Sequence, residues 1–220
     1  MSEHEHDVPP IVEGTDRMPA TGTDTGSAGG DGPAVIYPLV SNSGNERVLK
    51  DWLDDGDAYT VYRGDRSVTD AEFDLCIVDE TGLQRHGDDL TAARSAAQPV
   101  LLPVLLLYSG QAGPIEPTHD SGIGSTVDEI VSLPIRQTEL RWRIRTLLRL
   151  RNHSLGLQHR TEELRQFREA ADASGHAIYI TDAEGIIEYV NPAFEEITGH
   201  SREEVVGETP SLLQSGEYDS

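Results

Sequence analysis

The sequence has one cysteine, one lysine and no long apolar run. The single cysteine, Cys76, excludes an intrachain disulfide and a cysteine-based zinc site. Because Cys76 lies within an apolar run, we interpret it as a small buried hydrophobic side chain. No apolar run approaches the about 20 residues that span a bilayer, and the first residues lack the basic and apolar regions of a secretory signal. We therefore expect a soluble, cytoplasmic protein.

The charge is strongly unbalanced toward acid. The formal net charge is −22, from 39 acidic and 17 basic residues, and Lys50 is the only lysine among the basic ones. Such a surface repels nucleic acid and anionic lipid, so we expect neither as a partner. An acid-rich, lysine-poor composition is typical of proteins from salt-loving archaea, whose salty cytoplasm screens the repulsion. The alternative is an acidic protein of an ordinary cell.

Four segments differ in composition. Residues 1–33 are rich in Gly, Thr, Asp and Pro and predict a disordered acidic tail. Residues 34–150 alternate apolar strands with helices or loops about five times. Several of these strands are apolar throughout, as in a parallel sheet covered on both faces, so we predict a doubly wound α/β domain. Within this domain, "GDDLTAARSAA" is a predicted helix, whereas residues 110–127 show only loop chemistry.

Residues 151–174 predict a helical linker. Leu150, Leu157, Leu164 and Ala171 recur every seven residues, which is one line of a heptad. The second line is poor, and Gly156 argues against one unbroken helix. We expect a helical connector with weak coiled-coil pairing.

Residues 175–220 carry clear local signals of an α+β unit. "AIYITD" and "IIEYV" are two strands joined by an Asp-Ala-Glu-Gly turn. Asn191 and Pro192 are expected to begin a helix, and Gly199 to end it. Ser201 and Glu204 form a capping box for a second short helix.

This last segment resembles the start of a PAS sensor domain. "ITDAEGIIEYVNPAFEEITGHSREEVVGETPSLLQSG" has the acid-x-x-Gly hairpin, Asn-Pro-x-Phe, Thr-Gly and Glu-Glu-x-x-Gly features of the PAS opening. The resemblance implies a truncated PAS domain, of which only the first half is present. Pro210 stands where some PAS domains carry a flavin-binding cysteine, so no flavin-cysteine adduct is expected; the PAS ligand stays unknown. His176 and His200 are interpreted as a surface residue and a loop residue.

Residues 34–150 resemble a response-regulator receiver domain, which has a flavodoxin-like, doubly wound parallel sheet. "FDLCIVDETG" is similar to the third strand and places Asp79 at the phospho-accepting position. "PVLLPVLLLYSG" is similar to the fourth strand, with Tyr108 or Ser109 at the switch position, and "DEIVSLPI" to the fifth. Receiver, helical linker and PAS in this order resemble the front end of multi-domain signalling proteins of halophilic archaea. Those proteins end in a histidine kinase or in a bacterio-opsin-activator-type transcription regulator.

Aspartyl phosphorylation needs more than one aspartate. A divalent cation held by several oxygens must screen the repulsion between the phosphoryl group and its nucleophile. Where a receiver has its acid pair this sequence has Ser41 and Asn42, and Leu133 replaces the phosphate-binding lysine. Mg²⁺ is therefore expected only if Asp79 is phosphorylated.

Asp79 therefore has two interpretations. We predict that it is a turn residue, with Gly82 as fourth member of a type I turn, and that the domain is not phosphorylated by the ordinary route. The alternative is a working phosphorelay receiver with Asp79 as acceptor.

The remaining expected function is an interaction surface. "TELRWRIRTLLR" is similar to the last helix of a receiver, and the resemblance implies a homodimer through this helix and the linker. The one basic stretch lies on and beside it and consists of Arg136, Arg141, Arg143, Arg145, Arg149 and Arg151. The alternative is a solvated face that pairs with acidic neighbours. No kinase motif or helix-turn-helix is visible, so we expect a non-enzymatic signalling module, or a fragment of a PAS-containing histidine kinase or transcription regulator.

Overall fold

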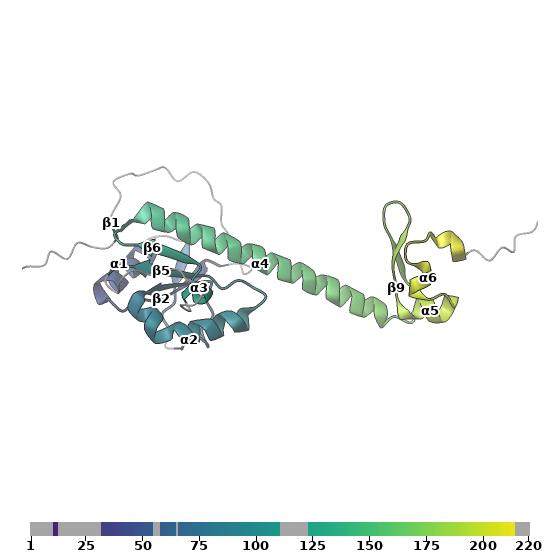
Figure 1. Cartoon of the computed structure of the whole chain (residues 1–220), viewed down its shortest axis with the longest axis horizontal. Coiled ribbons are helices and arrows are strands. Elements are labelled where there is room, and N and C mark those ends of the chain that lie inside the picture. The colour runs from purple at the N-terminus through teal and green to yellow at the C-terminus, as the bar shows by residue number, and fades with distance from the viewer. Residues whose placement is uncertain (1–10, 13–31, 55–57, 65, 111–122, 214–220) are drawn as a thin grey trace, which may run out of the picture. The chain divides into compact units, whose positions relative to one another are not determined.

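The computed structural model describes residues 11–12, 32–54, 58–64, 66–110 and 123–213 (Figure 1). It divides into two compact units, Met1–Gln158 and His159–Ser220, which are considered separately. The predicted disordered tail, residues 1–33, falls mostly outside the described residues.

The first unit is built on a five-stranded, fully parallel sheet. Its strand order is β3-β2-β4-β5-β6. The strands are β2 (Ala34–Leu39), β3 (Tyr59–Val61), β4 (Leu75–Asp79), β5 (Val104–Tyr108) and β6 (Glu129–Ser132). The chain therefore moves outward from β2 to one edge, returns, and continues to the other edge, which is the flavodoxin-like order. This confirms the predicted doubly wound sheet.

Helices cover both faces of this sheet (Figure 1). Leu75 and Ile77 of β4 pack in the cluster that includes α1 (Ser43–Asp54) and the first part of α4 (Gln137–Asp172). Cys76 and Val78 pack on the opposite face, with α2 (Glu80–Ala97). Successive side chains of a strand point to opposite faces, so an apolar strand buried on both sides needs two layers of helix.

Two elements differ from the sequence-based prediction for this unit. Helix α2 begins at Glu80, directly after β4, and not at the predicted Gly87. In residues 110–127, where only loop chemistry is visible in the sequence, a four-residue helix α3 (Ile123–Thr126) forms. The intervening residues 111–122 lie outside the described part of the chain.

A short strand lies within the predicted tail. β1 (Ile11–Val12) pairs in parallel with β7 (Ile135–Arg136), and the side chain of Ile11 is buried in the core shared with α1 and α4. The prediction of a disordered tail is therefore wrong at these two residues. The physical reason is that Ile11 is buried by segments far away in the chain, among them a partner strand more than a hundred residues later.

Helix α4 is continuous from Gln137 to Asp172. It includes Gly156, where the sequence argued against one unbroken helix, and it crosses the predicted border between the α/β domain and the linker at residue 150. A glycine inside a helix costs only about 1 kcal/mol relative to alanine, which the surrounding helix-forming residues can offset. Among the described residues, no helix combines the length and apolar character needed to cross a membrane.

An aspartate fastens α4 to the amino-terminal edge of the sheet. The backbone amide of Asp74 donates to the Val35 carbonyl at 2.7 Å, and the Val35 amide donates back to Asp74 Oδ2 at 2.8 Å. Arg151 of α4 donates from Nε to Asp74 Oδ1 at 3.0 Å and from Nη1 to the Leu101 carbonyl at 2.9 Å. We call this the Asp74–Arg151 clamp.

The opposite face has an equivalent arrangement. The Asp128 amide donates to the Val104 carbonyl at 2.9 Å, and the Val104 amide donates to Asp128 Oδ2 at 2.8 Å. Arg94 of α2 donates from Nη2 to Asp128 Oδ1 at 3.0 Å. We call this the Asp128–Arg94 clamp. It holds α2 as the first clamp holds α4, so on each face of the sheet a helix is bonded to an aspartate that precedes a strand.

The second unit follows the local signals of its sequence. Strands β8 (Tyr179–Thr181) and β9 (Ile187–Val190) form an antiparallel hairpin, and Gly185 in its turn has φ of 85°. The helices α5 (Pro192–Thr198) and α6 (Arg202–Val205) and the 3₁₀-helix η1 (Pro210–Leu213) follow. Asn191 caps α5, and Gly199 ends it with φ of 77°, as predicted. A small core forms from Ile187, Val190, Phe194 and Val205.

Candidate functional site

The carboxyl ends of β2, β4 and β5 meet at one edge of the sheet, where Asp79 is the last residue of β4. Asp79 Oδ1 accepts from the Gly82 amide at 2.6 Å. Asp79 Oδ2 accepts from the Ser41 amide at 2.7 Å and from the Asn42 amide at 3.4 Å. Both carboxylate oxygens of Asp79 thus accept hydrogen bonds from backbone amides, one from the following helix and the other from the loop after β2.

Asp79 is the N-cap of helix α2, and not a residue of the predicted type I turn. Its extended backbone (φ −95°, ψ 174°) lets the carboxylate satisfy an amide of the first helical turn. Position 82 requires glycine because of a close contact, and not because of turn geometry. A Cβ at Gly82 would overlap the carbonyl oxygen of Leu39, so the first turn of α2 packs directly on the end of β2.

Glu80 holds the residue at the predicted switch position. Its Oε1 accepts from the Ser109 amide at 2.9 Å, from Ser109 Oγ at 3.0 Å and from the Gly110 amide at 3.2 Å. Its Oε2 is 3.1 Å from Ser109 Oγ. Sequence reasoning took Glu80 only as part of a turn. The signal that could have identified Glu80 is its place in the first turn of α2, beside the neighbouring strand β5, after which Ser109 follows.

Two further positions considered in the sequence are Lys50 and Leu133, and neither brings a cation to Asp79. Lys50 lies in α1 and pairs with Glu46 at 2.6 Å. Leu133 follows β6 and packs against the apolar core, and its amide donates to the Tyr108 carbonyl at 2.7 Å. Within the described residues, no group of three or more His, Cys, Asp or Glu is arranged to hold a metal ion.

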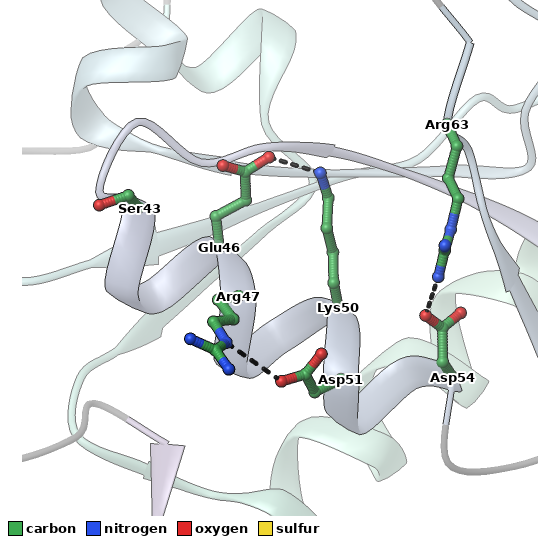
Figure 2. A pocket seen from close by; sticks show the side chains of 7 residues that line it. All are labelled: Ser43, Glu46, Arg47, Lys50, Asp51, Asp54 and Arg63. Atoms are coloured by element: carbon green, nitrogen blue, oxygen red, sulfur yellow. Dashed lines mark hydrogen bonds and ion pairs between the residues drawn. The ribbon is translucent and has the colours of Figure 1, made fainter.

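Helix α1 carries an open pocket of about 340 Å³ (Figure 2). Lys50 pairs with Glu46, Arg47 lies 3.7 Å from Asp51, and the charged residues of the pocket are thus largely paired with each other. Its lining consists of Ser43, Glu46, Arg47, Lys50, Asp51, Asp54 and Arg63. Such a lining is that of a solvated helix face, and we assign it no ligand.

The second unit is organised around the buried side chain of Asn191. Its Nδ2 donates to the carbonyls of Ala171 at 2.7 Å and His176 at 3.0 Å. Its Oδ1 accepts from the amides of Ile178 at 2.9 Å and Phe194 at 3.0 Å. One side chain therefore joins the end of α4, the start of the hairpin and the start of α5. The sequence predicted only the cap on α5.

His176 contributes only its carbonyl to the Asn191 centre, while its side chain is exposed. His176 is exposed between α4 and β8, His200 lies in the loop between α5 and α6, and Pro210 begins η1.

Burial raises the pKa of the Cys76 thiol far above its ordinary value, so this group stays protonated inside the α/β unit.

Comparisons with known proteins give one match. Comparison with curated proteins and with solved structures returned no match. A family model described as the PAS fold matches residues 165–220, which begin within the last two turns of α4 and include the Asn191 centre. The chain therefore combines a flavodoxin-like parallel α/β unit, a long helix and a region of the PAS fold.

Proposed function

We propose that the chain is an intracellular signalling module, in which a receiver-like domain is coupled through α4 to a PAS sensor region. The observation that carries this proposal is the PAS-fold match over residues 165–220, because PAS domains are sensors. The Asn191 bonds support the coupling, since they attach the end of α4 directly to the hairpin and to α5. The ligand of the PAS region is not part of the proposal.

We further propose that the receiver-like domain acts by contact and not through an aspartyl phosphate. The bonds to Asp79 support this, because both oxygens already accept from backbone amides. A phosphoryl group on Oδ1 or Oδ2 would weaken the bond from the amide at that oxygen, because an ester oxygen is a poorer acceptor than a carboxylate oxygen. Lys50, the chain's only lysine, is paired with Glu46 on α1.

A second candidate is a phosphorelay receiver with Asp79 as acceptor. The observation that favours it is the position of Asp79 at the carboxyl end of a central parallel strand, where working sites of α/β sheets lie. Mg²⁺ would then be required, with Asp79 among its ligands. In either case, the α/β unit, helix α4 and the PAS region together are compatible with the front part of a histidine kinase or a transcription regulator.

Phosphorylation in vitro separates the two candidates. The full chain is incubated in high salt with acetyl phosphate or phosphoramidate and Mg²⁺, and its intact mass is measured. We expect no stoichiometric gain of a phosphoryl group. A stoichiometric gain that is lost in Asp79→Asn and kept in Asp88→Asn, an exposed acid of α2, would establish the phosphorelay candidate instead.

The composition supports a proposal about the cell. A net charge of −22 with a single lysine fits the cytoplasm of a salt-loving archaeon, where the repulsion is screened.

A further inference from the structure

The basic stretch at the start of α4 contains arginines of two kinds. Residues 136–152 include six arginines and one acid, Glu139. Arg143 pairs with Glu129 and also lies 3.5 Å from Glu139, and Arg151 belongs to the Asp74–Arg151 clamp. These two arginines are therefore neutralised by acids of the α/β unit.

Three other arginines of α4 have no such partner. They are exposed, and they form no ion pair with any residue that the structure describes: Arg141, Arg145 and Arg149. Because they stand four residues apart, they form one row along the helix, with about 6 Å between neighbours. Like charges at this spacing repel each other and destabilise a helix slightly. We call these three residues the arginine stripe.

Helix α1, which packs beside α4, has no free carboxylate to offer the stripe. Each of its acids is already paired with a cation outside α4 (Figure 2). The pairs are Glu46–Lys50, Asp51–Arg47 and Asp54–Arg63. In a chain with 39 acidic and 17 basic residues, an exposed row of arginines without acids is a distinct feature of the surface.

Two aromatic side chains border the stripe and leave its charge in place. Arg141 Cζ lies 5.5 Å from the ring centroid of Trp52, near the end of α1. Burial raises the pKa of Tyr59 in β3, and the nearby charges of Arg145 and Arg141 act in the opposite direction. Tyr59 is therefore a neutral phenol at neutral pH. The aromatic rings position two of the guanidinium groups without neutralising them.

The spacing of the stripe indicates the form of its partner. Guanidinium groups only donate hydrogen bonds, and their planar forks match the paired oxygens of a carboxylate. Alternate side chains of an extended segment lie about 6.6 Å apart on one side, which is close to the spacing of the arginines. A partner helix would need apolar contacts between the two axes, whereas the stripe consists of charged side chains.

Charge distinguishes a short acidic segment from a long polyanion. The chain has a net charge of −22, so a nucleic acid that extends beyond the stripe is repelled by the rest of the surface. A short segment contacts the stripe alone. At about 1 M salt the screening length is about 3 Å, so direct contacts between arginine and carboxylate persist while the long-range repulsion is lost.

We propose that the arginine stripe is a docking surface for an extended acidic segment of another protein, with carboxylates on alternate residues. The inference goes beyond the proposed function, because it concerns a partner of the α/β unit and requires neither phosphorylation nor a PAS ligand.

Charge-matched variants test this surface. The probe is a fluorescently labelled peptide of nine residues that alternates Thr and Glu, and its binding to the full chain is measured by anisotropy. The salt concentration is the lowest that preserves the circular dichroism of the chain. Arg145→Gln with Arg149→Gln removes two charges of the stripe. We expect this double variant to bind the peptide about fivefold more weakly, or weaker still.

The control is a double variant with the same net charge. Arg66→Gln with Arg85→Gln removes two exposed arginines outside α4, and it should change the affinity less than twofold. Unchanged circular dichroism shows that both double variants are folded. Equal weakening by the two variants, or no binding of the peptide to the original chain, overturns the proposal.

Three further outcomes would identify a different occupant and so contradict the proposal. Inorganic phosphate that displaces the peptide as well as unlabelled peptide does would indicate a site for small anions. A ten-nucleotide oligouridine that binds the stripe more tightly than the peptide would indicate RNA. Self-association of the full chain in sedimentation equilibrium, lost only in the stripe variant, would indicate a second copy. None of these outcomes bears on the phosphorylation experiment, which uses Asp79.

Discussion

Asp79 and Glu80 are adjacent carboxylates with separate structural tasks. Asp79 bonds the amides of Ser41 and Gly82, and Glu80 bonds the amide and hydroxyl of Ser109. Together they tie the loop after β2, the start of α2 and the end of β5. The acids that stand at the carboxyl-terminal edge of this sheet therefore act as acceptors for the backbone.

Gly82 and Gly87 provide a matched pair of substitutions in α2. Gly82→Ala should lower the free energy of unfolding by about 2–3 kcal/mol, because its Cβ would overlap the Leu39 carbonyl oxygen. No atom lies within 4 Å of the position that a Cβ would take at Gly87, so Gly87→Ala should leave stability unchanged or raise it by up to about 1 kcal/mol. Denaturant unfolding at constant salt measures both. Equal effects of the two substitutions would contradict the close approach.

Asn191 offers a second prediction at this scale. Asn191→Asp keeps acceptors for the amides of Ile178 and Phe194 but loses both donors to the Ala171 and His176 carbonyls. Hydrogen exchange measured by mass spectrometry should therefore rise in the last turn of α4 more than in α5.

Tyr189→Phe is the control for Asn191→Asp. It removes one exposed hydrogen bond, from the Tyr189 hydroxyl to Asp172 at 2.6 Å, and should raise exchange less. Unchanged exchange at the end of α4 in Asn191→Asp would show that the buried amide does not hold this helix.

At the scale of elements, the two clamps repeat one design on opposite faces of the sheet. In each, an aspartate precedes a strand, exchanges two bonds with the first residues of a neighbouring strand, and binds an arginine of a covering helix. The two arginine residues come from α2 and α4, so each helix is hydrogen-bonded to the aspartate that precedes a strand.

Removing one carboxylate tests the Asp74–Arg151 clamp. Asp74→Asn should lower the free energy of unfolding by about 1–3 kcal/mol, because the side chains of Asp74 and Arg151 are only 18% and 14% exposed and the arginine would lose its charged partner.

A surface pair on the same helix is the matched control. Hydrogen bonds from Arg165 and Gln166 hold the pKa of Glu162 at about 2, but water screens this exposed pair. Glu162→Gln should therefore leave the unfolding midpoint unchanged. If Asp74→Asn also leaves the unfolding midpoint unchanged, the clamp does not stabilise α4.

The sequence predicts elements well where the signal is local. All five strands of the sheet, the Asn191 cap and the Gly199 helix end follow from apolar runs and capping residues. The start of α2 was missed because Asp-Glu-Thr-Gly fits both a turn and a capped helix. Strand β1 was missed because two residues carry no periodicity, and their partner lies at Ile135.

The candidate site was less predictable than the fold. The position of Asp79 at a strand end follows from the sequence, but its bonds to Ser41 and Asn42 depend on how two strands lie side by side. The Asp74–Arg151 clamp joins residues 77 positions apart, and the pattern around either residue does not identify the other. Contacts of this kind need the tertiary structure.

For the whole molecule, net charge sets the conditions of stability. A charge of −22 repels itself in the folded state, and the screening length falls from about 10 Å at 0.1 M to about 3 Å at 1 M salt. The thermal unfolding midpoint, measured by circular dichroism, should therefore rise as KCl increases over this range. NaCl should give a similar gain, since screening depends on ionic strength. A midpoint that stays constant would contradict a dominant role of self-repulsion.

The contact between α2 and the end of β2 has a consequence for protein engineering. Acids placed at residues 41 and 42, and a lysine at residue 133, would supply the side chains of a phosphotransfer centre. They would not move the first turn of α2, which is held by backbone against the Leu39 carbonyl at Gly82. Because this contact and the amide bonds to Asp79 would persist, we expect the three substitutions alone not to give a working centre.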